Sequence, residues 1–295
     1  MIGRVTQRSI ALNSLTNLQN AQSRTAKLQE QLSSGKSLSK GSDDSVRAAA
    51  ALRLNDQIAG NDANTRNIAD ARAWNTTQEE ALTSVADRLS YVRDLAVRAG
   101  NATLDDKGRA AIVAEINEAK ASILGSANAQ YQGRAVFAGT RDTTQAYDPV
   151  TYASADNGAA VTRTISPGVD MTVNVNGGAV FGTAPNSLFD ELTDLAAAVT
   201  ANNGTAIGAS LVGLDSRISK NATALATIGA RDNQLDHAEE VNANQLQYLR
   251  TQLDDVEGVD MAKTYVEFNM QNVAYQAALQ ATAKTIQPTL LDFLR

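Results

Sequence analysis

The chain has 295 residues, of which 43% are hydrophobic, 20% charged and 4% aromatic, and its formal net charge is −6. This acidic excess argues against nucleic acid or an anionic membrane as a partner, because both require a basic face. The sequence has no cysteine, which excludes disulfides and thiolate metal sites. Few aromatic residues and long stretches rich in Ala, Leu, Gln and Asn favour long helices that pack along narrow seams.

Neither a membrane span nor a signal peptide is predicted. No stretch approaches the roughly 20 consecutive apolar residues of a membrane-spanning helix, so we expect no membrane insertion. The N-terminal stretch MIGRVTQRSIALNSLTN lacks the uninterrupted apolar segment of a secretory signal. If the protein is exported, we expect a route without a cleaved signal peptide.

A heptad pattern runs through the first predicted helix. Its positions recur every three or four residues, with a threonine at the one polar position: Leu18, Ala21, Thr25, Leu28 and Leu32. This spacing is typical of a coiled-coil seam. The segment SSGKSLSKGSDDS ends the helix at its glycines, and Ser42 or Asp43 can cap the next helix.

Two more helices are predicted before residue 133. The second helix has a strong apolar stripe formed by Leu82, Val85, Leu89, Val92, Ala96 and Ala99, and Gly100-Asn101 closes it. The third begins near Leu104-Asp105-Asp106, where acidic residues favour a helix start. Its apolar face consists of Ile112, Ile116, Ala119 and Ile123, and it is expected to end between Asn128 and Gly133.

The character of the sequence changes after the segment QGRAVFAGT. Three of the four prolines lie in the next fifty residues, together with several glycines. The short alternating runs VTRTI and MTVNVNG read as strands, and the second leads into the turn signal Asn176-Gly177. We expect a small β-rich insertion here.

A helical pattern returns at Ser187 and again from about Ile207 through His237. The last region carries apolar residues at heptad-like spacing on both sides of Gly258: Leu246, Leu249, Leu253, Val256, Val259, Ala262, Val266, Met270, Val273 and Ala277. Two long seams therefore flank an interrupted middle. The economical arrangement folds the chain back on itself, so that its terminal helices pair as a coiled coil.

The predicted fold class is mainly α, with long antiparallel helices in a discontinuous coiled-coil bundle and a small β-rich inserted domain. Three domains are expected: residues 1–42 with 253–295 as a terminal coiled-coil assembly domain, 43–145 with 187–252 as a helical rod domain, and 146–186 as a small β-rich outer domain.

Candidates for catalysis are few. His237 is the only histidine, and it lies in the polar run DNQLDHAEE, so we interpret it as an exposed side chain. Gly35-Lys36-Ser37 resembles the end of a phosphate-binding loop, but Glu30 stands where that motif requires its first glycine. We expect no catalytic residue, no metal and no cofactor, and therefore a protein that is not an enzyme.

The chain ends in the apolar segment LLDFLR, which something is expected to cover, because exposed apolar area costs about 25 cal/mol per Å². Membrane docking would require basic residues beside the apolar face, but Asp292 lies inside the segment and only Arg295 balances it. Two function classes remain. One is a structural subunit whose paired termini pack against neighbouring subunits. The other is a monomeric secreted coiled-coil scaffold whose apolar end docks on one partner.

Several segments resemble the flagellin superfamily. KLQEQLSSGKSLSKGSDDSVRAAAALRL is similar to the N-terminal region of that family, RLSYVRDLAVRAGN to its first-domain helix, and YQAALQATAKTIQPTLLDFLR to its C-terminal helix. The GRAVFAGT segment and the ending resemble members that lie between hook and filament. Gly41 stands where those members commonly have proline, and Arg295 extends the usual end, which leaves flagellin, the filament subunit itself, as an alternative.

The resemblance implies a structural subunit of the bacterial flagellum that forms the layer between hook and filament and is needed for filament attachment and motility. It implies export in an unfolded state and an extracellular location. The implied partners are further copies in a homo-oligomeric ring, a neighbouring hook-associated protein, flagellin and a cytoplasmic export chaperone.

Two sets of residues are expected to make these contacts. The assembly interface is predicted at Leu18, Leu28, Leu32, Val266, Met270, Val273, Leu279 and Ile286. The resemblance assigns chaperone binding and assembly to the C-terminal segment, at Leu290, Leu291, Phe293 and Leu294. For Leu18, Leu28 and Leu32, an ordinary core role within one chain stays open.

Overall fold

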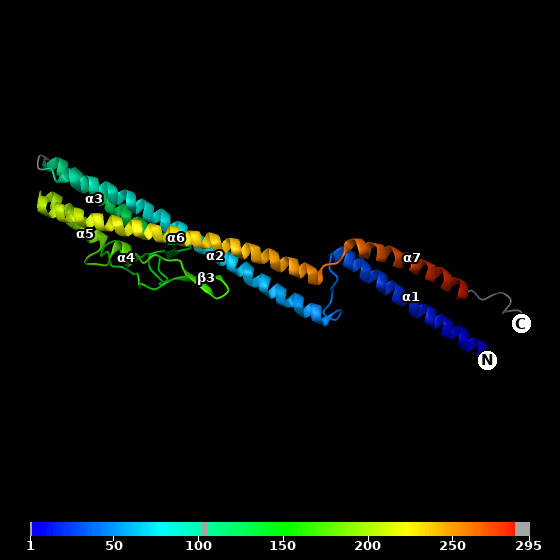
Figure 1. The fold of residues 1–295 in the computed structure, drawn as a ribbon. Helices are drawn as coiled ribbons and strands as arrows, with labels where there is room; N and C mark the ends of the chain where they lie inside the picture. The colour runs from blue at the N-terminus through cyan, green and yellow to red at the C-terminus, as the bar shows by residue number, and fades with distance from the viewer. Residues whose placement is uncertain (1, 102–104, 287–295) are drawn as a thin grey trace. The chain divides into compact units, whose positions relative to one another are not determined.

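The computed structural model describes residues 2–101 and 105–286, which are mainly helical, and the predicted fold class is confirmed (Figure 1). In chain order the elements are α1 (Ile2–Ser34), α2 (Ser45–Ala99), α3 (Asp106–Ala127), β1 (Gln130–Tyr131), β2 (Arg134–Ala135), β3 (Thr162–Ser166), β4 (Val169–Thr172), α4 (Gly177–Phe181), α5 (Leu188–Thr200), α6 (Gly204–Glu257) and α7 (Met261–Ile286).

Packing divides the chain into two compact units. The terminal unit consists of Met1–Ala59 and Leu246–Arg295, and the central unit is Gly60–Gln245. Residues 146–186 lie within the central unit. The predicted division into three domains stays a prediction. Whether residues 146–186 fold as a separate domain depends on whether they unfold cooperatively by themselves.

Side-chain caps define where three helices begin. Asp105 accepts a hydrogen bond from the Gly108 amide at the start of α3, as the acidic start predicted. Ser187 forms a reciprocal capping box with Asp190 at the start of α5. For α2 the expected cap was wrong by one or two residues: Asp44 accepts from the amides of Val46 and Arg47.

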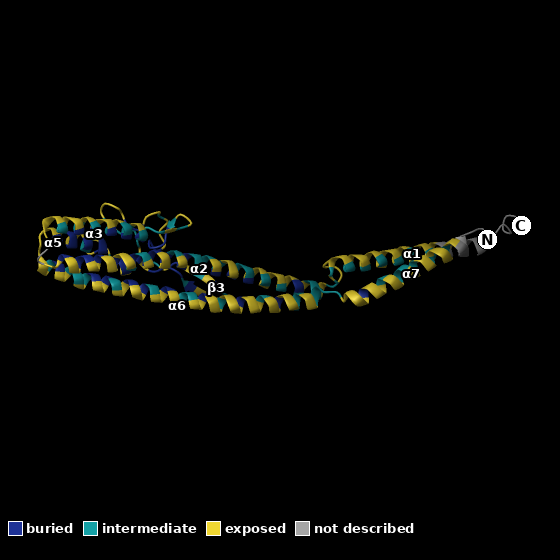
Figure 2. Ribbon diagram, turned by 90° about the horizontal axis from the view of Figure 1, so that it is seen from above, coloured by how far each residue is buried: buried dark blue, intermediate teal, exposed yellow. Residues whose placement is uncertain are grey.

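The apolar stripes predicted for α2 and α3 form the core of the central unit. Every residue of the α2 stripe from Leu82 to Ala99 and of the α3 face from Ile112 to Ile123 is buried. The inward face of α5 joins the same core, and Trp74 is fully enclosed in it. Figure 2 shows the buried residues concentrated in the part of this unit that contains α3 and α5.

Buried side-chain amides connect α2 to α6 within the central unit. Asn75 donates to the carboxylate of Asp232 over 2.8 Å, and Asn221 donates to the carbonyl of Leu82 over 2.9 Å. Near the other end, Asn242 donates to the carbonyl of Asn61 over 3.3 Å. A buried amide must find a partner, so these bonds fix which residues of the two helices lie opposite each other.

The insertion contains less β structure than the sequence predicts. Strands β3 and β4 form an antiparallel hairpin in the register Thr162↔Thr172, but the run that follows does not continue as a strand. Asn176 instead caps α4 by accepting from the Ala179 amide. Gly177 is required there because a Cβ atom would overlap the carbonyl oxygen of Phe137.

Gln78 of α2 ties the insertion to the helices. Its side-chain nitrogen donates to the carbonyl of Val136 over 2.9 Å, and its side-chain oxygen accepts from the Val175 amide over 3.3 Å. Both backbone groups are buried and would otherwise lack these partners. The side-chain amide of Gln78 thus binds both the GRAVFAGT segment and the base of the hairpin.

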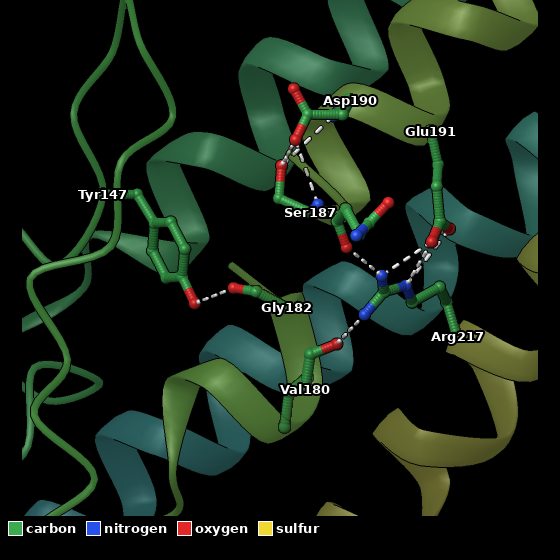
Figure 3. A network of polar contacts seen from close by, with 8 residues as sticks. Tyr147, Val180, Gly182, Ser187, Asp190, Glu191 and Arg217 are labelled. Carbon is green, nitrogen blue, oxygen red and sulfur yellow. Dashed lines mark hydrogen bonds and ion pairs between the residues drawn. The ribbon is translucent and has the colours of Figure 1, made fainter. Parts of the chain in front are cut away.

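A second network closes the turn between α4 and α5, as Figure 3 shows. The Arg217 guanidinium of α6 donates to the carbonyls of Val180 and Asn186, and it pairs with Glu191 over 2.6 Å. Gly182 has φ +78°, and a side chain there would collide with Arg217. Tyr147 donates to the Gly182 carbonyl over 2.9 Å, and burial raises the pKa of Tyr147 to about 12.

Replacing Arg217 is expected to destabilise the central unit. The Arg217 side chain is 7% exposed, so Arg217→Ala leaves Glu191 without its ion pair and two carbonyls without donors. Breaking a largely buried pair from one side costs about 3 to 5 kcal/mol, and the partial exposure of Glu191 favours the lower end. Chemical denaturation measures this loss.

Arg93→Ala is the matched control, because its ion pair with Asp215 is about half exposed on both sides. Such a pair contributes less than about 1 kcal/mol. Equal losses of stability in the two variants would contradict the role assigned to Arg217.

Candidate assembly surface

Helices α1 and α7 pack side by side in the terminal unit. The less exposed face of α1 contains the predicted heptad positions, and Ser14 extends it toward the N-terminus: Ser14, Leu18, Ala21, Thr25, Leu28 and Leu32. The corresponding face of α7 has the same spacing: Thr264, Phe268, Gln271, Tyr275, Ala278 and Thr282. Gln271 donates across the pair to the Ala21 carbonyl at 3.5 Å. The terminal helices therefore pair within one chain, as predicted.

The aliphatic row of α7 lies outside the face that contacts α1, with Met270 at the edge of that face. Val266, Met270 and Val273 each lie two positions after a residue of the contact face, which rotates them by about 200° around the helix. They are 55%, 61% and 67% exposed, and Leu279 is 42% exposed. We call Val266, Met270 and Val273 the outer row of α7. In a single chain, the outer row has its apolar side chains largely in water.

The predicted interface residues thus fall into three groups. Leu18, Leu28 and Leu32 lie on the α1 face that meets α7 of the same chain and remain partly accessible. The outer row and Leu279 are exposed. Ile286 ends α7, but its side chain is outside the described residues, as are Leu290, Leu291, Phe293 and Leu294.

A groove of about 490 Å³ lies between α1 and α7. Leu28, Met270 and Ala274 contribute apolar surface to it, and charged side chains also line it: Arg24 and Lys27 from α1 and Glu267 from α7. An apolar seam flanked by charges of both signs is the arrangement with which helices of a coiled coil receive a further helix.

The turn that follows α1 binds the end of α6. Both the amide and the hydroxyl of Ser37 donate to the Glu257 carbonyl, over 2.6 and 2.9 Å. The Val259 amide donates to the Gly35 carbonyl over 3.2 Å, and Lys36 pairs with the Glu257 carboxylate over 2.6 Å. These bonds satisfy the carbonyls that a helix end leaves without partners. The turn acts as the C-terminal cap of α6.

Sequence reasoning missed Arg47, which completes this cap. Its guanidinium donates to the Val256 carbonyl through two nitrogens and to the Ser37 hydroxyl over 2.8 Å. We call Ser37, Arg47, Val256 and Glu257 the turn clamp. No local signal marks Arg47, because its partner Val256 lies 209 positions away in the sequence.

Catalysis, metal binding and membrane insertion have little support among the described residues. His237 is exposed on α6. Within residues 2–101 and 105–286, no group of three or more His, Asp or Glu side chains could hold a metal ion. Among the same described residues, no helix is long and apolar enough to cross a membrane.

Comparison with known proteins gives a consistent result. The family descriptions "Bacterial flagellin N-terminal helical region" and "Bacterial flagellin C-terminal helical region" match residues 5–142 and 211–294. Flagellin of Bacillus subtilis is 30% identical over 99% of this chain and 100% of its own length. Flagellar hook-associated protein 3 of Salmonella typhimurium is 24% identical over 96% of this chain and 95% of its own.

A solved structure shares the architecture. It comes from Vibrio parahaemolyticus, is described as that of a flagellar hook-associated protein, and matches with a TM-score of 0.69 and 25% identity. The match covers 73% of this chain and all of the solved chain.

Replacing Arg47 is expected to open the turn clamp. Arg47→Ala removes the donors to the Val256 carbonyl and the Ser37 hydroxyl. Hydrogen bonds from a charged donor contribute about 1.5 to 3 kcal/mol, so amide exchange at Ser37 and Val259 is expected to rise about tenfold or more. Hydrogen exchange measures this change. The control is Arg53→Ala, an exposed arginine further along α2, and similar acceleration in that variant would contradict the clamp.

Proposed function

Because the chain belongs to the bacterial flagellin family, we propose that it is a structural subunit of the flagellum in the layer between hook and filament, needed to attach the filament. The observation that carries this proposal is the match to the Vibrio hook-associated protein, which extends over that whole solved chain. The nearly full-length match to hook-associated protein 3 supports the same assignment. A structural subunit requires no catalytic residue.

The GRAVFAGT segment supports the junction assignment. Val136, Phe137 and Ala138 of that segment are fully buried. Gln78 and Gly177 both contact its backbone closely. The segment that resembles junction members is therefore part of the core packing of the central unit.

The second candidate is the filament subunit itself. It is favoured by the match to Bacillus flagellin, which has the higher identity and spans the whole of that protein. The two candidates differ in where the protein lies along the flagellum and in how many copies it contributes.

The outer row of α7 supports an assembly role. A row of apolar side chains on a helix face is typical of a surface that another helix covers. We propose that neighbouring subunits cover the outer row together with the groove beside Leu28. In this arrangement Leu18, Leu28 and Leu32 hold α1 on α7, and the outer row makes the contact between chains.

The remaining partners follow from this role. We propose a homo-oligomeric ring that contacts a neighbouring hook-associated protein on one side and flagellin on the other. We propose an extracellular location at the hook-filament junction, reached without a cleaved signal peptide. A cytoplasmic export chaperone is proposed to bind the C-terminal segment before export.

Labelling of isolated flagella tests the location. Electron microscopy with an antibody against this chain is expected to show one band at the boundary between hook and filament. Labelling along the whole filament would instead establish the filament subunit.

Substituting the outer row tests the interface. The variant Val266→Ser, Met270→Ser and Val273→Ser is expected to release filament subunits into the medium, because each covered apolar side chain contributes about 1.5 to 3 kcal/mol. The thermal midpoint of the isolated protein is expected to change little, because these side chains are mostly exposed in the single chain.

The matched control replaces exposed valines elsewhere, Val212→Ser and Val241→Ser on α6, and is expected to keep the filament attached. Normal swimming of cells that carry the outer-row variant would refute the proposed interface.

The C-terminal segment is tested separately. Replacing Leu290, Leu291, Phe293 and Leu294 by Ser is expected to abolish co-purification with the export chaperone, because four apolar side chains are lost from a short segment. Asp292→Asn, which keeps all four, is expected to retain binding. Unchanged co-purification of the quadruple variant would show that the chaperone binds elsewhere.

A further inference from the structure

A cavity of about 440 Å³ lies within the central unit. Four parts of the chain form its walls: residues 158–160 before β3, Thr172 with residues 174–176 after it, Ala179 and Val180 of α4, and one face of α6 from Ser219 to Arg231. Small side chains, including Ala159, Ala179 and Ala224, leave its interior open.

Arg231 places a charge at one end of this cavity without an acidic partner. It is half-buried, and the bond that its guanidinium makes there is one from Nη1 to the Asn174 carbonyl over 3.0 Å. In the described parts of the chain it has no ion pair, and its neighbour Asp232 accepts from Asn75 instead. Burial lowers the pKa of Arg231, and no carboxylate offsets that effect.

The contrast with Arg217 shows what Arg231 lacks. Arg217 lies on the same helix, is more deeply buried, and pairs with Glu191. Burying a charge is unfavourable unless a counter-charge compensates it. Among the described residues that line the cavity there is no Asp or Glu, whereas Lys220 lines it as a second cation. The cavity therefore carries positive charge only, which complements an anionic occupant.

The face of α6 between the two cations indicates the length of the occupant. Lys220 and Arg231 are eleven residues apart, which corresponds to about 16 Å along a helix. One small anion cannot contact both ends at once. An extended peptide advances about 3.3 Å per residue, so roughly five residues span this distance.

The middle of the same face presents hydrogen-bond acceptors. The hydroxyls of Thr223 and Thr227 line the cavity and donate their protons to the carbonyls of Ser219 and Thr223. Their oxygens can therefore only accept a further hydrogen bond. Acceptors between two cations suit an occupant with N–H groups in the middle and carboxylates at the ends.

We propose that this cavity binds an extended acidic peptide segment of a partner protein, with one carboxylate on Arg231, the other near Lys220 and backbone amides against Thr223 and Thr227. This site is independent of the proposed function, because its residues lie outside the terminal unit. It gives the central unit a partner surface of its own.

The test uses the full chain with labelled alanine methyl groups and the probe acetyl-Glu-Ala-Gly-Ala-Glu-amide. Titration followed by NMR is expected to shift the methyl signals of Ala159, Ala179 and Ala224 in a saturable manner, with a Kd on the order of 1 mM or below. Arg231→Gln is expected to weaken binding about tenfold, and Lys220→Gln by a smaller factor. No shift at about 10 mM probe would overturn the proposal.

Controls separate the site from general charge effects. Arg66→Gln removes an exposed arginine of α2 and is expected to leave the Kd within about twofold. The neutral probe acetyl-Gln-Ala-Gly-Ala-Gln-amide is expected to bind about tenfold more weakly. Lys220 is exposed, so its variant folds normally and keeps the test valid if Arg231→Gln is unstable. Displacement of the probe by an equal concentration of succinate would establish a small-anion site and refute the peptide.

Discussion

The pairing of α2 with α6 in a single register is the constraint on which the central unit depends. Buried amides of Asn75, Asn221 and Asn242 bond across this pair, and a shift of one helix along the other would leave all three without partners. Each buried polar group left unpaired costs about 1 to 3 kcal/mol, which an all-aliphatic seam would not impose. The side-chain oxygens of Asn61, Asn75 and Asn221 already lack partners, so this interface gives up some stability. What it gains is a unique alignment, as a buried asparagine provides in a coiled coil.

The terminal unit follows a different principle. Its contact face combines leucines of α1 with threonine, glutamine and aromatic residues of α7, while the aliphatic outer row is largely exposed. A helix pair of this composition gains less from its own contact than an aliphatic seam would, and the aliphatic side chains of its outer row stay mostly in water. Within one chain, α1 and α7 are therefore paired, but the apolar outer row of α7 stays exposed. A subunit needs this combination of a formed helix pair and an exposed apolar row if it must remain separate before assembly and stable within a polymer.

Much of the fold could be predicted from the sequence because apolar spacing is a local signal. The stripes from Leu82 to Ala99 and from Ile112 to Ile123 are buried as their period indicates, and the acidic start of α3 forms the expected cap. The contact face of α7 was not predicted, since the aliphatic row gives a stronger pattern than the row with Phe268 and Tyr275 that meets α1. The roles of Gln78, Arg47 and Arg217 depend on carbonyls that lie 31 to 209 positions away, and no periodicity reveals them. Likewise, the sequence does not distinguish Arg231 from other helical arginines. It differs from them because it is half-buried and has no carboxylate beside it in the cavity.

The turn clamp also has a consequence for the order in which the chain folds. Ser37 and Arg47 bind carbonyls more than 200 residues further on, so closing that loop in an unfolded chain costs about 5 kcal/mol in chain entropy. Once α2 and α6 have paired, the same two ends are already neighbours and most of that cost disappears. The clamp is therefore expected to form late, after the central unit, and only when the final quarter of the chain is present. A chain that emerges from a narrow channel one residue at a time would keep its terminal helices apart until nearly the whole molecule is out.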